Sequence, residues 1–439
     1  MRISTISFSA LIALLNYSVA SGETPCLGNC SGEGDSKECT FTFSVNLYAS
    51  ELGYFTVEEC GSQVMPVLGV EKGVTYKFIQ HNVTNYMHPL GFAYFPDGAH
   101  AELDELEPGI VPPGSSSTCA EDLSCPAPMY MLNGAPIGEY SNNPITGNVT
   151  TSLADFGLDA YEPDFFLRFT DWVAKGAFEI MLYFDVDDFE GDIFYFCHVS
   201  NHSNFMKMLF EINAIDISRY AQVHQFMSGR IKFVDSSGNL IKTEDSPEIP
   251  YSYEVPSTYD AMCGTFNVTD FQLPNAQCTK EFVCNVPSDN PGLAQYSDCM
   301  ASLDCAMMAG MTTNVASESE VALFIHQMIP HHQNAVNMAK ALLKTGKLDC
   351  PDVTVESDDC KMMVLMHSII AGQNHEIQLM RNVLKSQGFL LYDDCHVPVT
   401  EMEMPTVEKK AMEPNSLGIQ TSCTNFVPVI LALTLGLFL

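Results

Sequence analysis

Short runs of aromatic and β-branched residues fill the first half of the chain, with Gly, Pro, Asn and Asp between them. Between about residues 40 and 215 these runs are VTYKFIQHNV, DFFLRFT, FEIMLYFDV, DIFYFC and KMLFEI. Runs of this length and composition predict β-strands, and several in succession predict a β-sandwich. Turn-forming residues dominate residues 105–148, which predicts one or more long loops there.

The apolar pattern changes to a helical period from about residue 302 to residue 389. Two stretches repeat at alternating steps of four and three, and each predicts one face of a helix. A polar segment at 344–360 joins them, so we expect the two helices to lie antiparallel within a small bundle. The predicted faces are Phe324, Met328, His331, Ala335, Met338 and Leu342 in the first helix, and Met362, Met366, Ile369, Gln373, Glu376, Met380 and Val383 in the second.

The chain is therefore expected to be multidomain, with an all-β part followed by an all-α part. The segment between them begins with a hairpin-like piece and continues as a Pro-, Ser- and Glu-rich connector. It ends in a cysteine-rich stretch from Cys263 to Cys299. The predicted divisions are a signal peptide at 1–20, the β-domain at 21–218, the connector and cysteine-rich lead-in at 219–300, the helical domain at 301–390, a stalk at 391–425 and a hydrophobic tail at 426–439.

Both ends of the chain carry targeting signals. Arg2, an apolar run and the small residues at 18–20 are typical of a cleaved secretory signal. The apolar tail is shorter than the roughly 20 residues that span a bilayer as a helix. It follows small residues and a polar spacer, so it resembles a GPI-attachment signal, although a short tail anchor or a buried terminal helix is the alternative. We expect a secreted protein at the cell surface, attached to the plasma membrane through a lipid anchor.

Charge and sequons agree with an extracellular location. The formal net charge is −34 and no basic stripe occurs, which makes nucleic acid a poor partner and attracts cations. N-glycosylation sequons lie at Asn29, Asn82, Asn148, Asn201 and Asn267.

Sixteen cysteines in a secreted chain predict disulfide bonds. The equal gaps suggest the pairs Cys119–Cys125, Cys278–Cys284 and Cys299–Cys305, and Cys350 and Cys360 bracket a polar loop. Removal of Cys423 with the tail would leave fifteen cysteines, so one would be unpaired, and its sequence context nominates Cys197.

Cys197, His202 and Met206 are spaced Cys-x4-His-x3-Met in the turn after an aromatic strand. A mononuclear blue-copper site needs one thiolate, two imidazoles and a weak axial thioether. A single loop can supply three of these ligands, and His88, which follows another predicted strand, fits as the fourth. The alternative is a disulfide-bonded Cys197 and an ordinary loop histidine. The sequon at Asn201 would place a glycan beside His202 if it were used.

This late Cys-His-Met loop with an upstream histidine resembles the cupredoxin family, with azurin-like spacing. The resemblance implies a Greek-key sandwich with Cys197, His202 and His88 as equatorial ligands and Met206 as the axial ligand. His198 and Met208 are near alternatives. Multicopper oxidases need His-x-His pairs, and the sequence contains none. An oxygen-reducing oxidase is therefore disfavoured.

The first predicted helix of the bundle combines methionines with two adjacent histidines after Pro330. Buried polar groups are costly unless they are paired, so a helix seam carrying His, Gln and Glu suggests a purpose. Thioether and imidazole together favour Cu(I) or Ag(I), and Met307, Met308 and Met311 are further soft ligands upstream. Methionines at helical spacing are more often core residues, which is the alternative.

The sequence FIHQMIPHH…A..MA followed by I.AGQ..EI..M resembles the ferritin-like helical family known as domain of unknown function 305, whose bacterial members include periplasmic copper-binding proteins. No Glu-x-x-His pair occurs in this region, which disfavours a di-iron site. The resemblance implies metal ligation by Met328, His331, His332, Met338, Glu376 and Met380, with His326 and His375 as extra candidates.

The sequence thus predicts a copper-binding protein for copper acquisition, storage or homeostasis at the cell surface, and it indicates no hydrolytic triad. The alternatives are an electron-transfer cupredoxin or metalloreductase-like protein, which implies a redox partner protein, and a structural surface glycoprotein with a metal-free sandwich.

Overall fold

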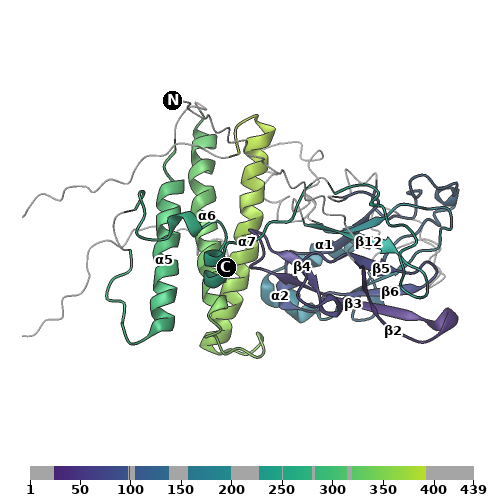
Figure 1. The fold of residues 1–439 in the computed structure, drawn as a ribbon, viewed down its shortest axis with the longest axis horizontal. Coiled ribbons are helices and arrows are strands. Elements are labelled where there is room, and N and C mark those ends of the chain that lie inside the picture. Colours follow the sequence, from purple (N-terminus) through teal and green to yellow (C-terminus); the bar gives the residue numbers. More distant parts are fainter. Residues whose placement is uncertain are drawn as a thin grey trace, which may run out of the picture. The chain divides into compact units, whose positions relative to one another are not determined.

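The computed structural model describes residues 24–96, 98, 104–137, 157–198, 227–249, 251–278, 282–313 and 319–391. Within these residues a β-sandwich precedes a helical domain, as the hydrophobic pattern predicted (Figure 1). The predicted signal peptide, most of the stalk and the hydrophobic tail lie outside the described residues. No helix in the described ranges is long and apolar enough to cross a membrane.

The first sheet places Cys197 at the end of a central strand. Strand β11 consists of five buried residues, and it pairs antiparallel on both sides with β7 and β12. The β7 register sets Cys197 opposite Leu90. In order, the five strands are β1 (Cys26–Leu27), β5 (Leu68–Val70), β12 (Ser228–Phe233), β11 (Ile193–Cys197) and β7 (Leu90–Ala93).

The second sheet closes the core from the other side. Burial alternates along β3, so that Phe41 and Phe43 face inward, as expected of a strand with one solvated face. Phe78 on β6 meets Phe92 on β7 of the first sheet at a ring distance of 4.8 Å. The strands are β2 (Asn29–Ser31), β3 (Glu38–Asn46), β6 (Thr75–Ile79), β10 (Phe178–Tyr183), β8 (Met129–Leu132) and β9 (Ala135–Pro136) in order, with β4 (Tyr54–Val57) paired to β3.

Three predicted strands are confirmed as β6, β10 and β11, but the strand predicted for DFFLRFT is wrong. That run crosses from α1 (Gly157–Phe165) into α2 (Phe169–Lys175). The aromatic residues Tyr161, Phe165, Phe169 and Trp172 recur at steps of four and three and are all buried, which is a helical period. Aromatic content drew the strand prediction, whereas spacing determines the structure.

The sandwich uses residues that the sequence assigned elsewhere. Strand β8 pairs with β10 inside the segment predicted as long loops. Strand β12 belongs to the predicted connector, yet it lies between β11 and β5, so the β-domain extends beyond residue 218. The predicted strand KMLFEI lies outside the described residues. Short 3₁₀ turns occur at η1 (Gly34–Ser36), η2 (Glu58–Cys60), η3 (Val83–Asn85), η4 (Cys119–Glu121) and η5 (Thr269–Phe271).

Three long helices follow a short one, α4 (Thr258–Cys263). They are α5 (Pro291–Gly310), α6 (Glu320–Lys344) and α7 (Asp358–Ser386), with Asn290, Ser319 and Ser357 as N-caps whose side chains accept a backbone N–H. Nε2 of His326 near the start of α6 lies 2.9 Å from the carbonyl of Leu390, beyond the end of α7. The predicted antiparallel arrangement of α6 and α7 is therefore confirmed.

The predicted faces of α6 and α7 are shifted in phase. On α6 the core side carries Ile325, Ile329, His332, Val336 and Ala339, whereas Phe324 is 60 % exposed and Met338 is 41 % exposed. On α7 the buried positions include Ile370, Asn374 and Ile377, each one residue after a predicted position. Apolar residues at steps of three and four fit more than one phase, and α6 contacts both α5 and α7.

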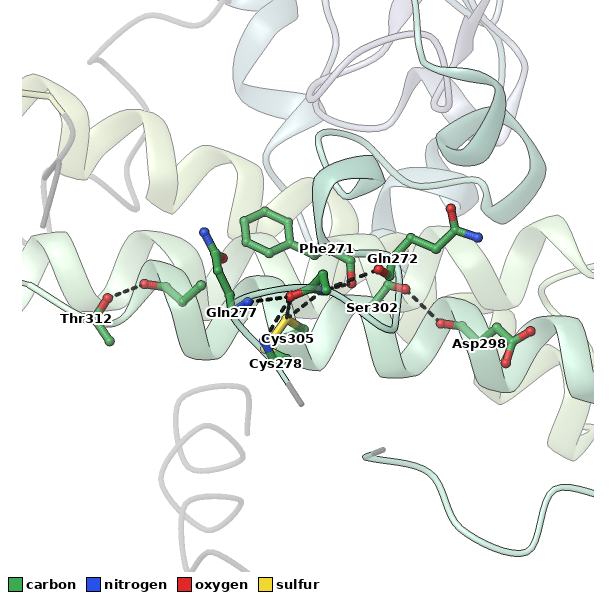
Figure 2. The surroundings of a disulfide bond; sticks show 10 residues. Phe271, Gln272, Gln277, Cys278, Asp298, Ser302, Cys305 and Thr312 are labelled. Carbon is green, nitrogen blue, oxygen red and sulfur yellow. Dashed lines mark hydrogen bonds between the residues drawn. A yellow bond between two sulfur atoms is a disulfide. The ribbon is translucent and has the colours of Figure 1, made fainter. Parts of the chain in front are cut away.

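Six disulfides join described cysteines. Cys119–Cys125 and Cys350–Cys360 form as the spacing suggested. The pairs Cys278–Cys284 and Cys299–Cys305 are wrong. Cys299 and Cys305 both lie on α5, where six residues rise about 9 Å, farther than a disulfide reaches. The bonds are Cys26–Cys60, Cys30–Cys39, Cys119–Cys125, Cys263–Cys299, Cys278–Cys305 and Cys350–Cys360, and Figure 2 shows the fifth, which attaches the lead-in to α5.

The loop after β3 is held by α6 and α7. Nζ of Lys340, a fully buried residue, donates to the carbonyls of Ser50 at 3.1 Å and Glu51 at 2.7 Å. The Glu51 carboxylate accepts from both terminal nitrogens of Arg381, at 2.7 and 2.9 Å, and from Nε2 of Gln333 at 2.6 Å. Burial disfavours the charge on Glu51. The charge and hydrogen bonds of Arg381, the hydrogen bond of Gln333 and the charge of Lys340 together outweigh burial and lower the pKa of Glu51.

Candidate metal centres

His88 and Cys197 come together inside the sandwich. His88 precedes β7 and Cys197 ends β11, so the antiparallel pairing of these strands sets the two side chains side by side. Gln80 fixes this turn, because its Nε2 donates to the carbonyl of His88 at 2.8 Å and its Oε1 accepts from the N–H of Leu90 at 3.0 Å. Cys197 is fully buried and His88 is 3 % exposed.

The two side chains lie at the separation of two ligands of one ion. Sγ of Cys197 is 3.4 Å from Nδ1 of His88. Metal–nitrogen and metal–sulfur bonds of about 2.0 and 2.3 Å at a roughly tetrahedral angle span about 3.5 Å. Cys197 takes no part in the six disulfides among the described residues, in contrast to the disulfide alternative. A thiolate with an imidazole is a donor set that suits copper.

The protonation state of His88 favours metal binding, whereas that of Cys197 opposes it. Burial, with a smaller effect from the charge of Lys340, lowers the pKa of His88 to about 3, so the imidazole is neutral and able to ligate. Burial first, and then the charge of Glu162, raises the pKa of the Cys197 thiol well above its ordinary value. A metal that binds there must displace the thiol proton.

Next to this pair lies a buried histidine–carboxylate contact. Nδ1 of His198 is 3.1 Å from Oε2 of Glu162, and the two side chains are 4 % and 3 % exposed. Glu162 stands on the buried face of α1 with Tyr161 and Phe165. Sequence reasoning missed Glu162 because the strand prediction for the following segment concealed its helical phase. A glutamate in register with buried aromatic residues was the available signal.

The remaining loop ligands of the predicted copper site, His202 and Met206, fall outside the described residues, as do Met208 and Asn201. Where the chain is described, no group of three or more His, Cys, Asp or Glu side chains is assembled for a metal ion. The structure therefore brings together two of the four predicted ligands of the sandwich.

On the seam between α6 and α7 the structure joins two other predicted ligands. Nδ1 of His332 lies 3.1 Å from Oε2 of Glu376 across the two helices. The ring of His331 lies beside the ring of His332, with a distance of 5.8 Å between their centroids. Buried atoms on these two helices without a hydrogen-bond partner among the described residues include Nδ1 of His331, Nδ1 of His332, Oε1 of Gln373 and Nε2 of His375. Unpaired buried acceptors of this kind are costly unless a bound group satisfies them.

The methionines of the predicted seam differ in their surroundings. Met380 is partly buried and packs against the core, and Met328 is half-buried. Met338 is 41 % exposed, so this member of the predicted face lies away from the buried side of α6. His326 points away to the Leu390 carbonyl.

Burial favours the neutral, ligating form of two histidines on these helices, His331 and His375. It lowers the pKa of His331, with a smaller contribution from His332. It also lowers the pKa of His375, although the charges of Glu376 and Glu162 oppose this. His367 on the same helix has its pKa lowered to about 4 by burial, and its ring stacks on Phe169 at 5.3 Å.

A separate cavity of about 220 Å³ lies between α5, α6 and the segment at 266–271. Met307, one of the upstream soft-ligand candidates, lines it, and its sulfur accepts from Nδ2 of Asn334 at 3.2 Å. Met308 is 41 % exposed. The pairing of Met307 with an amide gives no support for a soft-metal site at that position.

Comparison with known proteins covers the helical part of the chain. No curated protein and no solved structure matches the sequence. Residues 288–384 match the family model described as Domain of unknown function (DUF305), a span that contains α5, α6 and most of α7. The family resemblance predicted from the two helices is thereby confirmed for the C-terminal helical domain, and it extends to the helix before them.

Proposed function

We propose that the protein binds copper at the cell surface and serves copper acquisition, storage or homeostasis. Two sites of different donor chemistry would hold the metal, a cupredoxin-like site in the sandwich and a Met/His site on the seam between α6 and α7. The observation that carries the proposal is the contact between Cys197 and His88 in the buried core of the sandwich.

The sandwich site suits copper through its donors and its seclusion. Thiolate and imidazole ligands select copper or zinc over Mg²⁺ and Ca²⁺, which prefer oxygen. His202 and Met206 would complete the ligand set from the loop after β11. His198, held by Glu162, is the nearest described alternative to His202.

The seam site suits Cu(I) through its imidazoles and thioethers. His332 from α6 contacts Glu376 from α7, His331 lies beside His332, and Met328 and Met380 lie on the same two helices. Copper bound there would satisfy the unpaired nitrogen of His331. The −34 net charge would concentrate cations near the surface.

Electron transfer is the second candidate function. His88 and Cys197 are at most 3 % exposed, so a substrate cannot reach them directly, whereas an electron can pass through the surrounding protein. A redox partner protein would then exchange electrons with the sandwich copper. This role needs the same metal site and differs in needing reversible reduction of it.

The proposal is tested by copper stoichiometry. Equilibrium dialysis of the purified protein under reducing conditions should give two copper ions per chain. The single variant Cys197→Ser should bind one copper ion fewer, and so should the double variant His331→Ala with His332→Ala. Cys284→Ser, at an exposed cysteine, should leave the stoichiometry unchanged. A wild-type protein that retains no copper would contradict the proposal and favour a structural surface glycoprotein.

A further inference from the structure

The cavity of about 220 Å³ between α5, α6 and residues 266–271 is lined by none of the ligands proposed above for copper. An engineered apolar cavity of about 150 Å³ is large enough to bind benzene. The cavity therefore has room for a molecule of about ten non-hydrogen atoms.

The wall formed by residues 266–271 is fixed to both helices. The chain on either side of it is bonded to α5 through the disulfides Cys263–Cys299 and Cys278–Cys305, the second of which Figure 2 shows. On the α6 side, Oδ1 of Asn337 accepts from the N–H of Phe266 at 2.9 Å, and its Nδ2 donates to the Phe266 carbonyl at 3.2 Å. The cavity is therefore preformed, which lowers the ordering cost of binding a small molecule.

Two buried asparagines that line the cavity have unused hydrogen-bonding atoms. Asn374 on α7 is 2 % exposed, and neither its Oδ1 nor its Nδ2 has a hydrogen-bond partner among the described residues. Asn334 on α6 is 8 % exposed. Its Nδ2 donates to the sulfur of Met307 at 3.2 Å, but its Oδ1 has no partner in the described part of the chain. Buried amide atoms left unpaired are costly, so the two asparagines indicate a bound group that satisfies them.

The rest of the lining determines which kind of molecule fits. Apolar side chains form most of the wall, among them the rings of Phe266 and Phe271. Of the described residues that line the cavity, Glu51 alone is charged, and its carboxylate already accepts from Arg381 and Gln333. An anion would meet no positive side chain in this lining and would be repelled by Glu51. The lining therefore favours a neutral molecule with an apolar part.

We propose that this cavity binds a small neutral molecule in which a primary amide is joined to a planar apolar group. A primary amide offers N–H donors and one carbonyl acceptor. These groups match the unpaired Oδ1 atoms of Asn334 and Asn374 and the unpaired Nδ2 of Asn374. The planar group would pack against Phe266 and Phe271. The site needs no metal, so it is a binding activity beyond the copper function proposed above.

The proposal is tested first on the metal-free wild-type protein with three probes of similar shape. Benzamide carries the amide, benzoate replaces it with a negative charge, and acetophenone keeps the carbonyl without the N–H donors. In calorimetric titrations benzamide should saturate a single site, and the other two should bind at least tenfold more weakly. Absence of benzamide binding would leave water as the occupant and overturn the proposal, and equal affinity for all three probes would also overturn it.

Two variants test whether benzamide binds in this cavity. Asn374→Leu removes the unpaired amide, and Ala306→Met fills space at a lining position of α5, so each should weaken benzamide binding at least tenfold. Ala309→Met is the matched control, because Ala309 lies on the same helix but does not line the cavity, and it should bind as the wild type does.

Wild-type affinity in a folded Asn374→Leu or Ala306→Met protein would place benzamide elsewhere and overturn the site. Equal losses in Ala306→Met and Ala309→Met would assign the effect to the helix as a whole and would overturn it too. The comparison of the three probes uses no variant, so it decides the question even if a substituted protein does not fold.

Discussion

Sγ of Cys197 lies 3.4 Å from Nδ1 of His88, although 109 residues separate them in sequence. The antiparallel register of β7 and β11 produces this contact, and the sheet around it excludes water. The thiol and the imidazole are therefore brought together in a dry core by strand pairing.

The geometry at His88 should depend on Gln80. This fully buried side chain binds the His88 carbonyl and the Leu90 N–H, and the Tyr161 hydroxyl donates to it at 3.2 Å. Gln80→Leu would leave buried backbone groups unpaired, at about 1–3 kcal/mol each. We expect urea unfolding of the metal-free protein to show a loss of about 2–4 kcal/mol. Gln272→Ala, at an exposed glutamine, serves as the control, and an equal effect of both variants would refute this role for Gln80.

Lys340 should give the protein a pH-dependent stability. Burial lowers its pKa to about 7, although the charge of Glu51 opposes this, and its unfolded value is near 10.4. Between those values the unfolded chain binds a proton that the folded protein lacks, so stability rises with pH, by at most about 1.4 kcal/mol per unit. Guanidinium unfolding of the wild type and Lys340→Met at pH 7 and pH 9.5 should show their difference shifting in favour of the wild type. A difference that stays constant would show that Lys340 keeps an ordinary pKa.

The Glu51–Arg381 pair should stabilise the attachment of the β3–β4 loop to the helices. Arg381→Met removes both hydrogen bonds from arginine to the Glu51 carboxylate, to which Gln333 continues to donate. We expect a cost of about 2 kcal/mol, below that of a fully buried pair because 27 % of the Arg381 side chain is exposed. A double-mutant cycle with Glu51→Gln measures the coupling.

Arg168→Met is the matched control for that cycle. Arg168 pairs with Asp171 at the surface, where the side chains are 75 % and 46 % exposed, so thermal unfolding should show no change. A coupling of zero between Glu51 and Arg381 would rule out the attachment role.

Two methionines should differ in their effect on Cu(I). Met380 lies partly buried beside the seam, whereas Met338 is 41 % exposed. Both Met380→Leu and Met338→Leu keep size and apolarity and remove the thioether. Competition with a Cu(I) chelator should show about tenfold weaker binding for the first variant and no change for the second, since one lost donor is worth about 1.4 kcal/mol. Equal affinities would remove Met380 from the site.

Local pattern was enough to predict the order of the domains, the strands β6 and β11 and the antiparallel helices. It did not predict α1 and α2, because aromatic residues suit strands by composition and only their spacing revealed a helix. Local pattern also did not predict which face of α6 is buried. Apolar residues at steps of three and four fit several helical phases, and α6 packs against α5 as well as α7.

In the candidate sites, too, some features could be predicted from the sequence and others could not. Histidine and cysteine are both common metal ligands, so the sequence could suggest that His88 and Cys197 lie together. Glu162 and the Cys278–Cys305 bond depend on how distant segments pack, and no local spacing encodes that.

The most direct test of the account is the optical spectrum of the protein titrated with Cu(II). We expect an intense thiolate-to-copper charge-transfer band that saturates at one equivalent and disappears in Cys197→Ser and His88→Ala. Absence of the band from a folded wild-type protein, or its persistence in Cys197→Ser, would contradict the claim that Cys197 and His88 hold copper.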